Sequence, residues 1–142
     1  MNAPFPHHYE VNLASAGGLL GKLSAGQRPP LSGGSPPEFG GDDQSWSPEH
    51  LLLGSVRLCL MTTFAAITAK SKLDYSAYES RAEGILDKTP EGLRFTRVTL
   101  TVTARTSDAE RAARLLDMAK KHCIVSNSLR VPVEIEGTFV PI

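Results

Sequence analysis

Apolar residues alternate with polar or small ones near the N-terminus, which predicts a β-hairpin. The alternation covers residues 9–13, as in a half-buried strand. Gly17-Gly18 then supplies a turn, and residues 19–23 can return as the second strand. Residues 1–8 contain prolines and histidines and are expected to form a loose lead-in to this hairpin.

A second set of alternating stretches lies in the C-terminal half. Residues 93–104 place apolar side chains between threonines, which is typical of a strand with one solvent-exposed face. Residues 73–86 alternate less regularly, and a turn containing proline and glycine joins them to that strand. Residues 131–140 form the last stretch, in which Pro132 indicates a strand at a sheet edge.

The longest apolar pattern has helical spacing and extends from Ser47 to about Ala69. Ser47 is a suitable N-cap, Pro48 suits the first helical position, and Glu49 lies where the helix dipole favours an anion. Apolar residues recur at three- and four-residue steps and also extend around most of the circumference. Such a helix is expected to be central in the fold or to face another subunit.

A second helix is predicted to follow Ser107, because Ser107-Asp108-Ala109-Glu110 has the spacing of a capping box. Ser126-Asn127-Ser128 is expected to end it. Its apolar face is narrow and consists mostly of small residues: Ala109, Ala112, Ala113, Leu116, Ala119 and Cys123. The order of elements predicts a single α+β domain over residues 1–142, in which an antiparallel sheet packs on two main helices.

The segment 24–47 is rich in Gly, Pro and Ser and is predicted to be a long loop, because its proline and glycine pairs disfavour a helix or a central strand. Its position directly before a helix favours a functional role over disorder. It contains neither a GxGxxG motif nor a P-loop lysine, so no cofactor is expected. His7 and His8 lack the spacing of metal ligands, so no metal site is expected either.

Length and charge narrow the classes of function. The chain has 142 residues, and its 15 basic and 15 acidic side chains cancel without forming a basic cluster, which argues against nucleic-acid binding. No apolar run approaches the roughly 20 residues needed to span a bilayer, and the N-terminus lacks the features of a signal peptide. A cytoplasmic protein without membrane association is expected, in which cysteines are reduced thiols, a transient redox pair or core residues.

Cys59 and Cys123 are the two cysteines, one on each predicted helix and 64 residues apart (123 − 59). Each is either a buried core residue, as free cysteines often are, or a reactive thiol. Glu49 is likewise either an ordinary acidic residue of a first helical turn or part of a site. The residues by themselves leave both interpretations open.

Two motifs, one on each predicted helix, are typical of a known family. The first is Ser47-Pro48-Glu49-His50-Leu51-Leu52 with Cys59 ten residues after Glu49, and the second is Cys123-Ile124-Val125-Ser126-Asn127-Ser128-Leu129. With these motifs the chain resembles the OsmC/Ohr family of thiol-dependent peroxidases, over about two-thirds of its length and more loosely in the N-terminal hairpin. The resemblance implies an OsmC-like fold and an intertwined homodimer, with two active sites at the subunit interface.

The resemblance also implies a peroxiredoxin-like activity in the oxidative stress response. In that family the cysteine matching Cys59 attacks a peroxide as a thiolate and becomes a sulfenic acid. The cysteine matching Cys123 then resolves it to a disulfide, and a small dithiol or a lipoylated protein reduces the pair. Organic hydroperoxides are the preferred substrates of the Ohr branch.

The chain departs from the family at the activating cation. Family peroxidases carry an arginine directly after the Gly-Gly of the hairpin, which pairs with the glutamate, whereas this chain has Leu19. Arg57 is about 200° around the helix from Cys59 and is expected to point away. Arg28, in the long loop, is the candidate substitute. Glu49 lies about 15 Å from Cys59 along one straight helix, so it is expected to serve a site across a subunit interface.

Two functions of different classes are therefore open. The first is a peroxide reductase that uses Cys59 and Cys123. The second is a non-catalytic OsmC-like dimer that binds a small apolar ligand or senses oxidation, which the leucine at position 19 favours.

Overall fold

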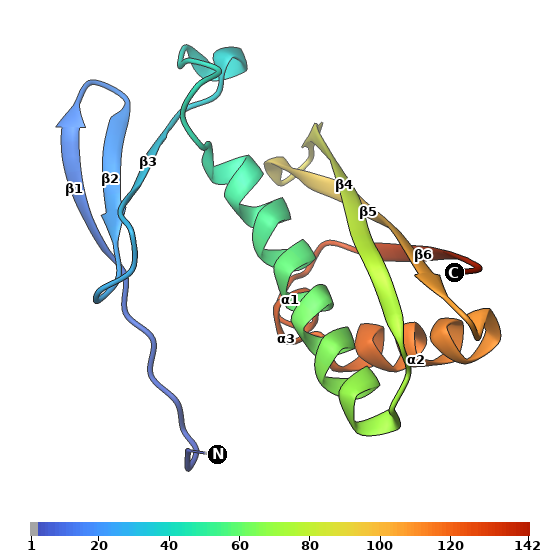
Figure 1. Ribbon diagram of the computed structural model, residues 1–142. Helices are drawn as coiled ribbons and strands as arrows, with labels where there is room; N and C mark the ends of the chain where they lie inside the picture. The colour runs from blue at the N-terminus through green and yellow to red at the C-terminus, as the bar shows by residue number, and fades with distance from the viewer. Residues whose placement is uncertain (1–2) are drawn as a thin grey trace. The chain divides into compact units, whose positions relative to one another are not determined.

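A computed structural model describes residues 3–142, and the chain divides into two compact units, Met1–Leu51 and Leu52–Ile142 (Figure 1). The first unit is built on a three-stranded antiparallel sheet in the order β1-β2-β3. The strands are β1 (Asn12–Gly17), β2 (Leu20–Ser24) and β3 (Leu31–Gly34). The predicted hairpin is thus present, but its first strand begins at Asn12 and not at residue 9, and its six residues are exposed and not half-buried.

Glycines make the hairpin turn and the sheet edge possible. Gly17 and Gly18 have φ values of 100° and 58°, which glycine adopts without a steric penalty. Residues 31–34, inside the segment expected to be a loop, form the edge strand β3, and a 3₁₀ turn, η1 (Pro37–Phe39), follows. A Cβ on Gly33 would lie 3.1 Å from the carbonyl oxygen of Trp46, so the glycine permits close approach of the two backbones. Glycine weakens a strand interior but is accepted at such an edge.

The helix α1 (Pro48–Ser71) is continuous over 24 residues. The hydroxyl of Ser47 accepts a hydrogen bond from the backbone N–H of His50 at 3.0 Å, which confirms Ser47 as the N-cap. Residues at four-residue steps form its buried face: Val56, Leu60, Phe64 and Thr68. Its most apolar 18-residue window has a mean hydropathy of 1.7 and is 22% buried. By length and composition α1 could cross a membrane, a test that core helices of globular proteins also pass.

The second unit contains a three-stranded sheet in the order β4-β5-β6. β4 (Tyr75–Thr89) and β5 (Gly92–Thr106) form a long antiparallel hairpin, and β6 (Val133–Val140) is the edge strand beside β5. The sheet was expected to be antiparallel throughout, but β6 runs parallel to β5. A parallel neighbour requires a crossover connection, which the helical segment between β5 and β6 provides.

The helix α2 (Ala109–His122) begins one residue later than the capping-box pattern indicated. Its N-cap is Asp108, whose carboxylate accepts a hydrogen bond from the backbone N–H of Arg111 at 3.1 Å. A separate short turn, α3 (Ile124–Asn127), follows the helix, so Cys123 lies between α2 and α3. The buried face of α2 consists of Ala112, Leu115, Leu116 and Ala119, whereas Ala109 and Ala113, which were expected on it, are exposed.

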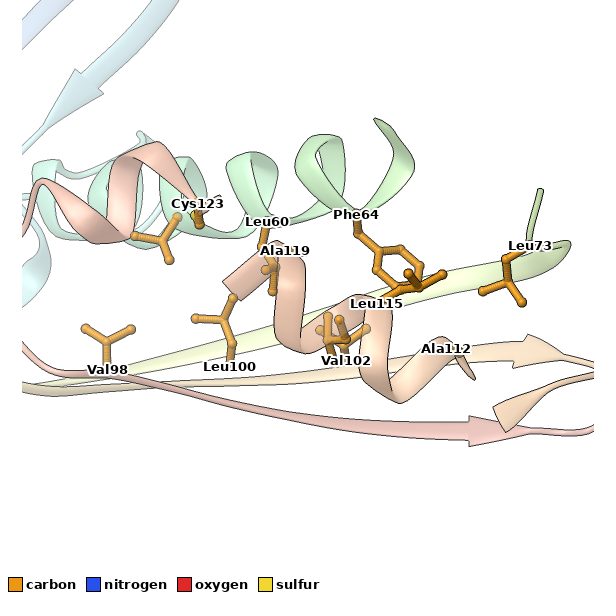
Figure 2. Close-up of a cluster of buried hydrophobic side chains, with 12 residues drawn as sticks. Leu60, Phe64, Leu73, Val98, Leu100, Val102, Ala112, Leu115, Ala119 and Cys123 are labelled. Atoms are coloured by element: carbon orange, nitrogen blue, oxygen red, sulfur yellow. The ribbon is translucent and has the colours of Figure 1, made fainter. Parts of the chain in front are cut away.

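The core of the second unit lies between α1, α2 and the inner face of β5. Side chains from these elements point toward one another in Figure 2, including Leu60 and Phe64 of α1 and Leu100 and Val102 of β5. Alternate residues of β5 are buried, as the sequence pattern predicted. The fold is therefore a mixed α+β fold, and Cys123 is part of its core.

Candidate redox site

The two cysteines lie together in the second unit. Cys59 is half-buried on α1, and Cys123 has 0% of its surface exposed. The Cys123 thiol is near enough to Cys59 to lower the pKa of the Cys59 thiol, and Figure 2 shows Cys123 beside α1. Residues 64 positions apart (123 − 59) are thus brought close together because α1 and the end of α2 pack in one core.

The surroundings of Cys59 lower the pKa of its thiol. Burial by itself acts to raise this pKa, but hydrogen bonds to the sulfur outweigh burial. The strongest comes from the backbone N–H of Val125 and the next from the thiol of Cys123. The hydroxyl of Thr63 and the backbone N–H of Ile124 add to the same effect. A lowered pKa increases the thiolate fraction at neutral pH, and the thiolate is the nucleophilic form.

The donors around Cys59 come from two elements. Thr63 is one helical turn after Cys59 on α1. Its hydroxyl donates its single hydrogen to the Cys59 carbonyl oxygen at 2.8 Å, and it can donate to the sulfur only by turning away from that oxygen. Ile124 and Val125 are the first residues of α3, whose backbone N–H groups have no partner within the helix. The chain therefore bends back at Cys123 and presents these free amides to the sulfur.

Glu49 lies in the first turn of α1, in the N-terminal unit. It is half-buried, and among residues 3–142 its Oε1 atom has no hydrogen-bond partner although it is buried. Because α1 is unbroken from Pro48 to Ser71, Glu49 and Cys59 are separated by about 15 Å of helix rise. The helix itself therefore does not bring the carboxylate to the thiol.

The candidate cations have other partners. Arg28 is exposed in the N-terminal unit, where its guanidinium donates to the Ala25 carbonyl of its own turn at 3.5 Å. Arg57 donates to Ser80 of β4, to the hydroxyl at 3.2 Å and also to the carbonyl oxygen. Arg57 was expected to point away from Cys59, and its bonds to Ser80 agree with this.

An apolar hollow of about 510 Å³ lies within the N-terminal unit. Leu19, the residue at the expected arginine position, is one of its lining residues and is 54% exposed. The other large apolar side chains around the hollow are Leu13, Leu20, Leu23, Trp46 and Leu51. This hollow suits an apolar group better than an anion. Over residues 3–142, no cluster of three or more His, Cys, Asp or Glu side chains could hold a metal ion.

Sequence reasoning identified both thiols and missed the groups around them. Thr63 could have been found, because a residue four positions after a helical cysteine lies on the same helix face. The sequence gives no indication that the amides of Ile124 and Val125 are donors to a thiol, since every residue other than proline has a backbone N–H. Tyr78, which also lies against this core, was noted only as part of a strand.

The sequence matches one protein-family model and a bacterial protein. Residues 41–137 match the family model described as OsmC-like protein. The Bacillus subtilis protein YmaD, itself uncharacterised, is 26% identical over 107 residues, which cover 71% of each chain.

Solved structures share the fold at low sequence identity. An OsmC-like protein of unknown function from Vibrio cholerae superposes with a TM-score of 0.85 at 17% identity, covering 94% of this chain and 100% of its own. The organic hydroperoxide resistance protein OsmC from Legionella pneumophila gives a TM-score of 0.72 at 20% identity, covering 96% and 99%. These likenesses show the fold.

Proposed function

We propose that this chain, which belongs to the OsmC-like protein family, reduces organic hydroperoxides with Cys59 and Cys123 as a redox pair. The observation that supports this most directly is the proximity of the two thiols, together with the lowered pKa of Cys59. The name of the Legionella structure, an organic hydroperoxide resistance protein, indicates the substrate class.

In the first step the Cys59 thiolate attacks the terminal oxygen of the hydroperoxide. An S–O bond forms, the O–O bond breaks, and the departing alkoxide takes a proton to become an alcohol. Cys59 is then a sulfenic acid. The N–H groups of Val125 and Ile124 stabilise negative charge on the sulfur before the attack.

In the second step the thiolate of Cys123 attacks the sulfur of the Cys59 sulfenic acid. The S–S bond forms, the S–O bond breaks, and hydroxide leaves as water after protonation. The proximity of the two thiols favours this step, which requires the Cα atoms of the two cysteines to lie within about 7 Å. A dithiol reductant, either a small molecule or a lipoylated protein, then returns both cysteines to thiols by disulfide exchange.

The backbone amides of α3 take the activating role that an arginine has in family peroxidases. This chain has Leu19 where family peroxidases have the arginine. Hydrogen bonds from backbone N–H groups favour the thiolate, as a nearby cation does, and so also lower the pKa of Cys59. The loss of the arginine therefore does not require loss of the peroxidase step.

We further propose that two copies of the chain form a homodimer through α1. Only 22% of the most apolar window of this helix is buried, and Leu58 and Met61 are 59% and 38% exposed. A second subunit would cover this surface. Dimerisation also offers a role for Glu49, whose buried Oε1 has no partner among residues 3–142.

Mixed dimers test the role of Glu49. One chain carries Glu49→Ala and the other carries Cys59→Ser, so each dimer retains one intact glutamate and one reactive cysteine on opposite chains. About half of the wild-type activity supports a site shared between subunits. Activity near that of the Cys59→Ser homodimer shows that Glu49 acts only within its own chain.

Thiol counting tests the proposed function. The reduced protein is mixed with cumene hydroperoxide, and free thiols are counted with time while the disulfide is identified by mass spectrometry. Rapid loss of both thiols and a Cys59–Cys123 disulfide are expected, whereas Cys123→Ser should accumulate the sulfenic acid and Cys59→Ser should retain its thiol. Persistence of both thiols in the wild type would exclude the peroxidase.

The alternative is an OsmC-like dimer that binds a small apolar ligand or senses oxidation without turnover. The apolar hollow around Leu19 favours this alternative. Persistent thiols combined with saturable binding of a fluorescent apolar probe, weakened by Leu19→Arg, would support it.

A further inference from the structure

The carbonyl oxygen of Cys59 has more hydrogen-bond donors than it can accept. The hydroxyls of Thr62 and Thr63 both donate to it, at 3.1 Å and 2.8 Å. Because α1 is continuous through these positions, the backbone N–H of Thr63 also donates to this oxygen in the regular helical pattern. A carbonyl oxygen has two lone pairs, so three donors compete for two positions. One of the two hydroxyls is therefore in excess.

The two threonines have different surroundings. Thr62 is exposed, whereas Thr63 is half-buried. Thr63 is four positions after Cys59 and four before Ile67, a spacing at which the side chains of a helix are neighbours. Both Cys59 and Ile67 pack against the core cluster of the second unit. Thr63 therefore lies on the side of α1 that carries the thiol toward the core.

The charge on Cys59 decides where the excess hydrogen bond goes. A hydroxyl hydrogen can turn about its C–O bond, so Thr63 can donate either to the carbonyl oxygen or to the sulfur of Cys59. A neutral thiol is a weak acceptor, and the hydroxyl then stays on the carbonyl oxygen, as its 2.8 Å contact indicates. Hydrogen bonds to a charged acceptor are about twice as strong as neutral ones. Burial acts against ionisation of Cys59, and Thr63 is one of the groups that lower the pKa of its thiol.

We propose that Thr63 is a catalytic residue whose hydroxyl hydrogen turns from the carbonyl oxygen of Cys59 to the sulfur when the thiolate forms. The inference rests on the proposed peroxidase function and concerns its first step. Donation to the sulfur stabilises the charge before the attack, and the carbonyl oxygen loses little because two other donors remain. Once the S–O bond forms, the charge leaves with the alkoxide and the hydrogen returns to the carbonyl oxygen.

Titration of Cys59 in three variants tests this proposal. Thr63→Val replaces the hydroxyl with a methyl group, and Thr62→Val is the matched control, because that hydroxyl bonds the same oxygen. The pH dependence of iodoacetamide alkylation, followed by mass spectrometry of the Cys59 peptide, gives the midpoint. Thr63→Val is expected to raise it by about one unit, since hydrogen bonds to charged groups are of this strength. Thr62→Val should leave it unchanged, and Thr63→Ser, which keeps the hydroxyl, should match the wild type. Equal midpoints in the two valine variants would overturn the proposal.

The pH profile of sulfenic acid formation separates this role from a structural one. In the Cys123→Ser background with cumene hydroperoxide at about pH 7, adding Thr63→Val should slow this step up to about tenfold, because fewer molecules carry the thiolate. About one pH unit above the midpoint of the variant, both proteins are mostly thiolate and their rates should agree within about twofold. The same slowing at both pH values would indicate a distorted helix and refute the proposal. If neither protein reacts with the hydroperoxide, the proposed function fails, and the titration by itself decides the role of Thr63.

Discussion

The thiol of Cys123, the residue between α2 and α3, lies close enough to Cys59 to lower the pKa of the Cys59 thiol. The same bend of the chain presents the amides of Ile124 and Val125 to Cys59. One short segment thus supplies both the second thiol and the groups that favour the first thiolate. Redox partner and activating group are therefore not independent features of this fold.

Replacing Ile124 by proline should weaken the nucleophile. Ile124 is the first residue of α3 and 74% exposed, and Cys123 before it is extended with a ψ of 106°. Proline is therefore compatible with this position, and it removes the N–H donor together with an exposed side chain. The pKa of Cys59 should rise by up to about one unit, and alkylation at neutral pH should slow up to about tenfold. The pH dependence of iodoacetamide alkylation measures both.

Ile124→Ala is the matched control for this substitution. It removes the same side chain and retains the N–H group, so the alkylation profile of Cys59 should stay close to that of the wild type. If the proline and alanine variants titrate alike, the amide of Ile124 does not activate the thiol.

The two thiols should differ strongly in reactivity toward alkylating reagents. Cys59 is half-buried with a lowered pKa, whereas Cys123 has 0% of its surface exposed. We expect modification at Cys59 at least about tenfold faster in the native, reduced protein, and equal rates after unfolding in guanidinium. Peptide mass spectrometry after timed quenching gives both rates. Faster native modification of Cys123 would contradict this arrangement.

The protein should lose stability at alkaline pH as Tyr78 ionises. Its pKa of about 12 in the folded state, raised chiefly by burial, exceeds the value of about 10 for an unfolded tyrosine, so folding favours the protonated form. This contribution to stability is complete below about pH 10 and is lost as the pH rises through about 12. Tyr78→Phe cannot titrate, so its free energy of unfolding should fall less between about pH 9 and about pH 11 than that of the wild type. Urea unfolding at the two pH values measures the difference.

The register of β4 against β5 shifts between Ser76 and Glu79, which indicates a bulge at Ala77. A glycine at this position should not destabilise the protein, unlike glycine elsewhere in the strand. Ala77 has a φ of 53°, a conformation that costs an L-residue about 1–2 kcal/mol and glycine almost nothing. Because glycine also increases the entropy of the unfolded chain, Ala77→Gly should be neutral or stabilising by up to about 1 kcal/mol. Ala82→Gly, at a half-buried position of the same strand, should destabilise by about 1 kcal/mol. Equal losses in both variants would show that Ala77 is not strained.

A charge on the exposed side of α1 should disrupt the proposed homodimer. Leu58 on α1 and Leu93 on β5 are equally exposed leucines, at 59% and 58%. Leu58→Glu is expected to give a monomer, because it places a charge in an apolar interface, whereas Leu93→Glu should leave the oligomeric state unchanged. Analytical ultracentrifugation distinguishes the species. A monomeric wild type, or a dimeric Leu58→Glu variant, would refute an interface on this side of α1.

The sequence pattern predicted the elements whose periodicity is long and regular. α1 and β5 are examples. Each buries one face against the same core, so apolar residues recur in its sequence at the spacing of that face. The parallel direction of β6 was not predicted, since alternation within a strand contains no information about the direction of its neighbour. The bulge at Ala77 was missed for a similar reason, because alanine gives no indication of a positive φ.

The site was predictable only in part. Helical spacing and the family motifs identified Cys59 and Cys123, but no spacing along the chain shows that the amides of α3 reach a thiol on α1. Arg28 was selected as a cation by elimination, and its exposed guanidinium bonds to its own turn. Backbone groups that act at a distance in sequence require coordinates.

The distance between Cys59 and Cys123 along the sequence has a consequence for how fast the protein is degraded. A bond between them would close a loop of about 64 residues that contains β4, β5 and α2, and a cross-link of this length restricts the unfolded chain by about 4 kcal/mol. Oxidised molecules would then unfold and be digested more slowly than reduced ones. Protease susceptibility would thus report the redox state of the population, and a cell short of reductant would accumulate the longer-lived form.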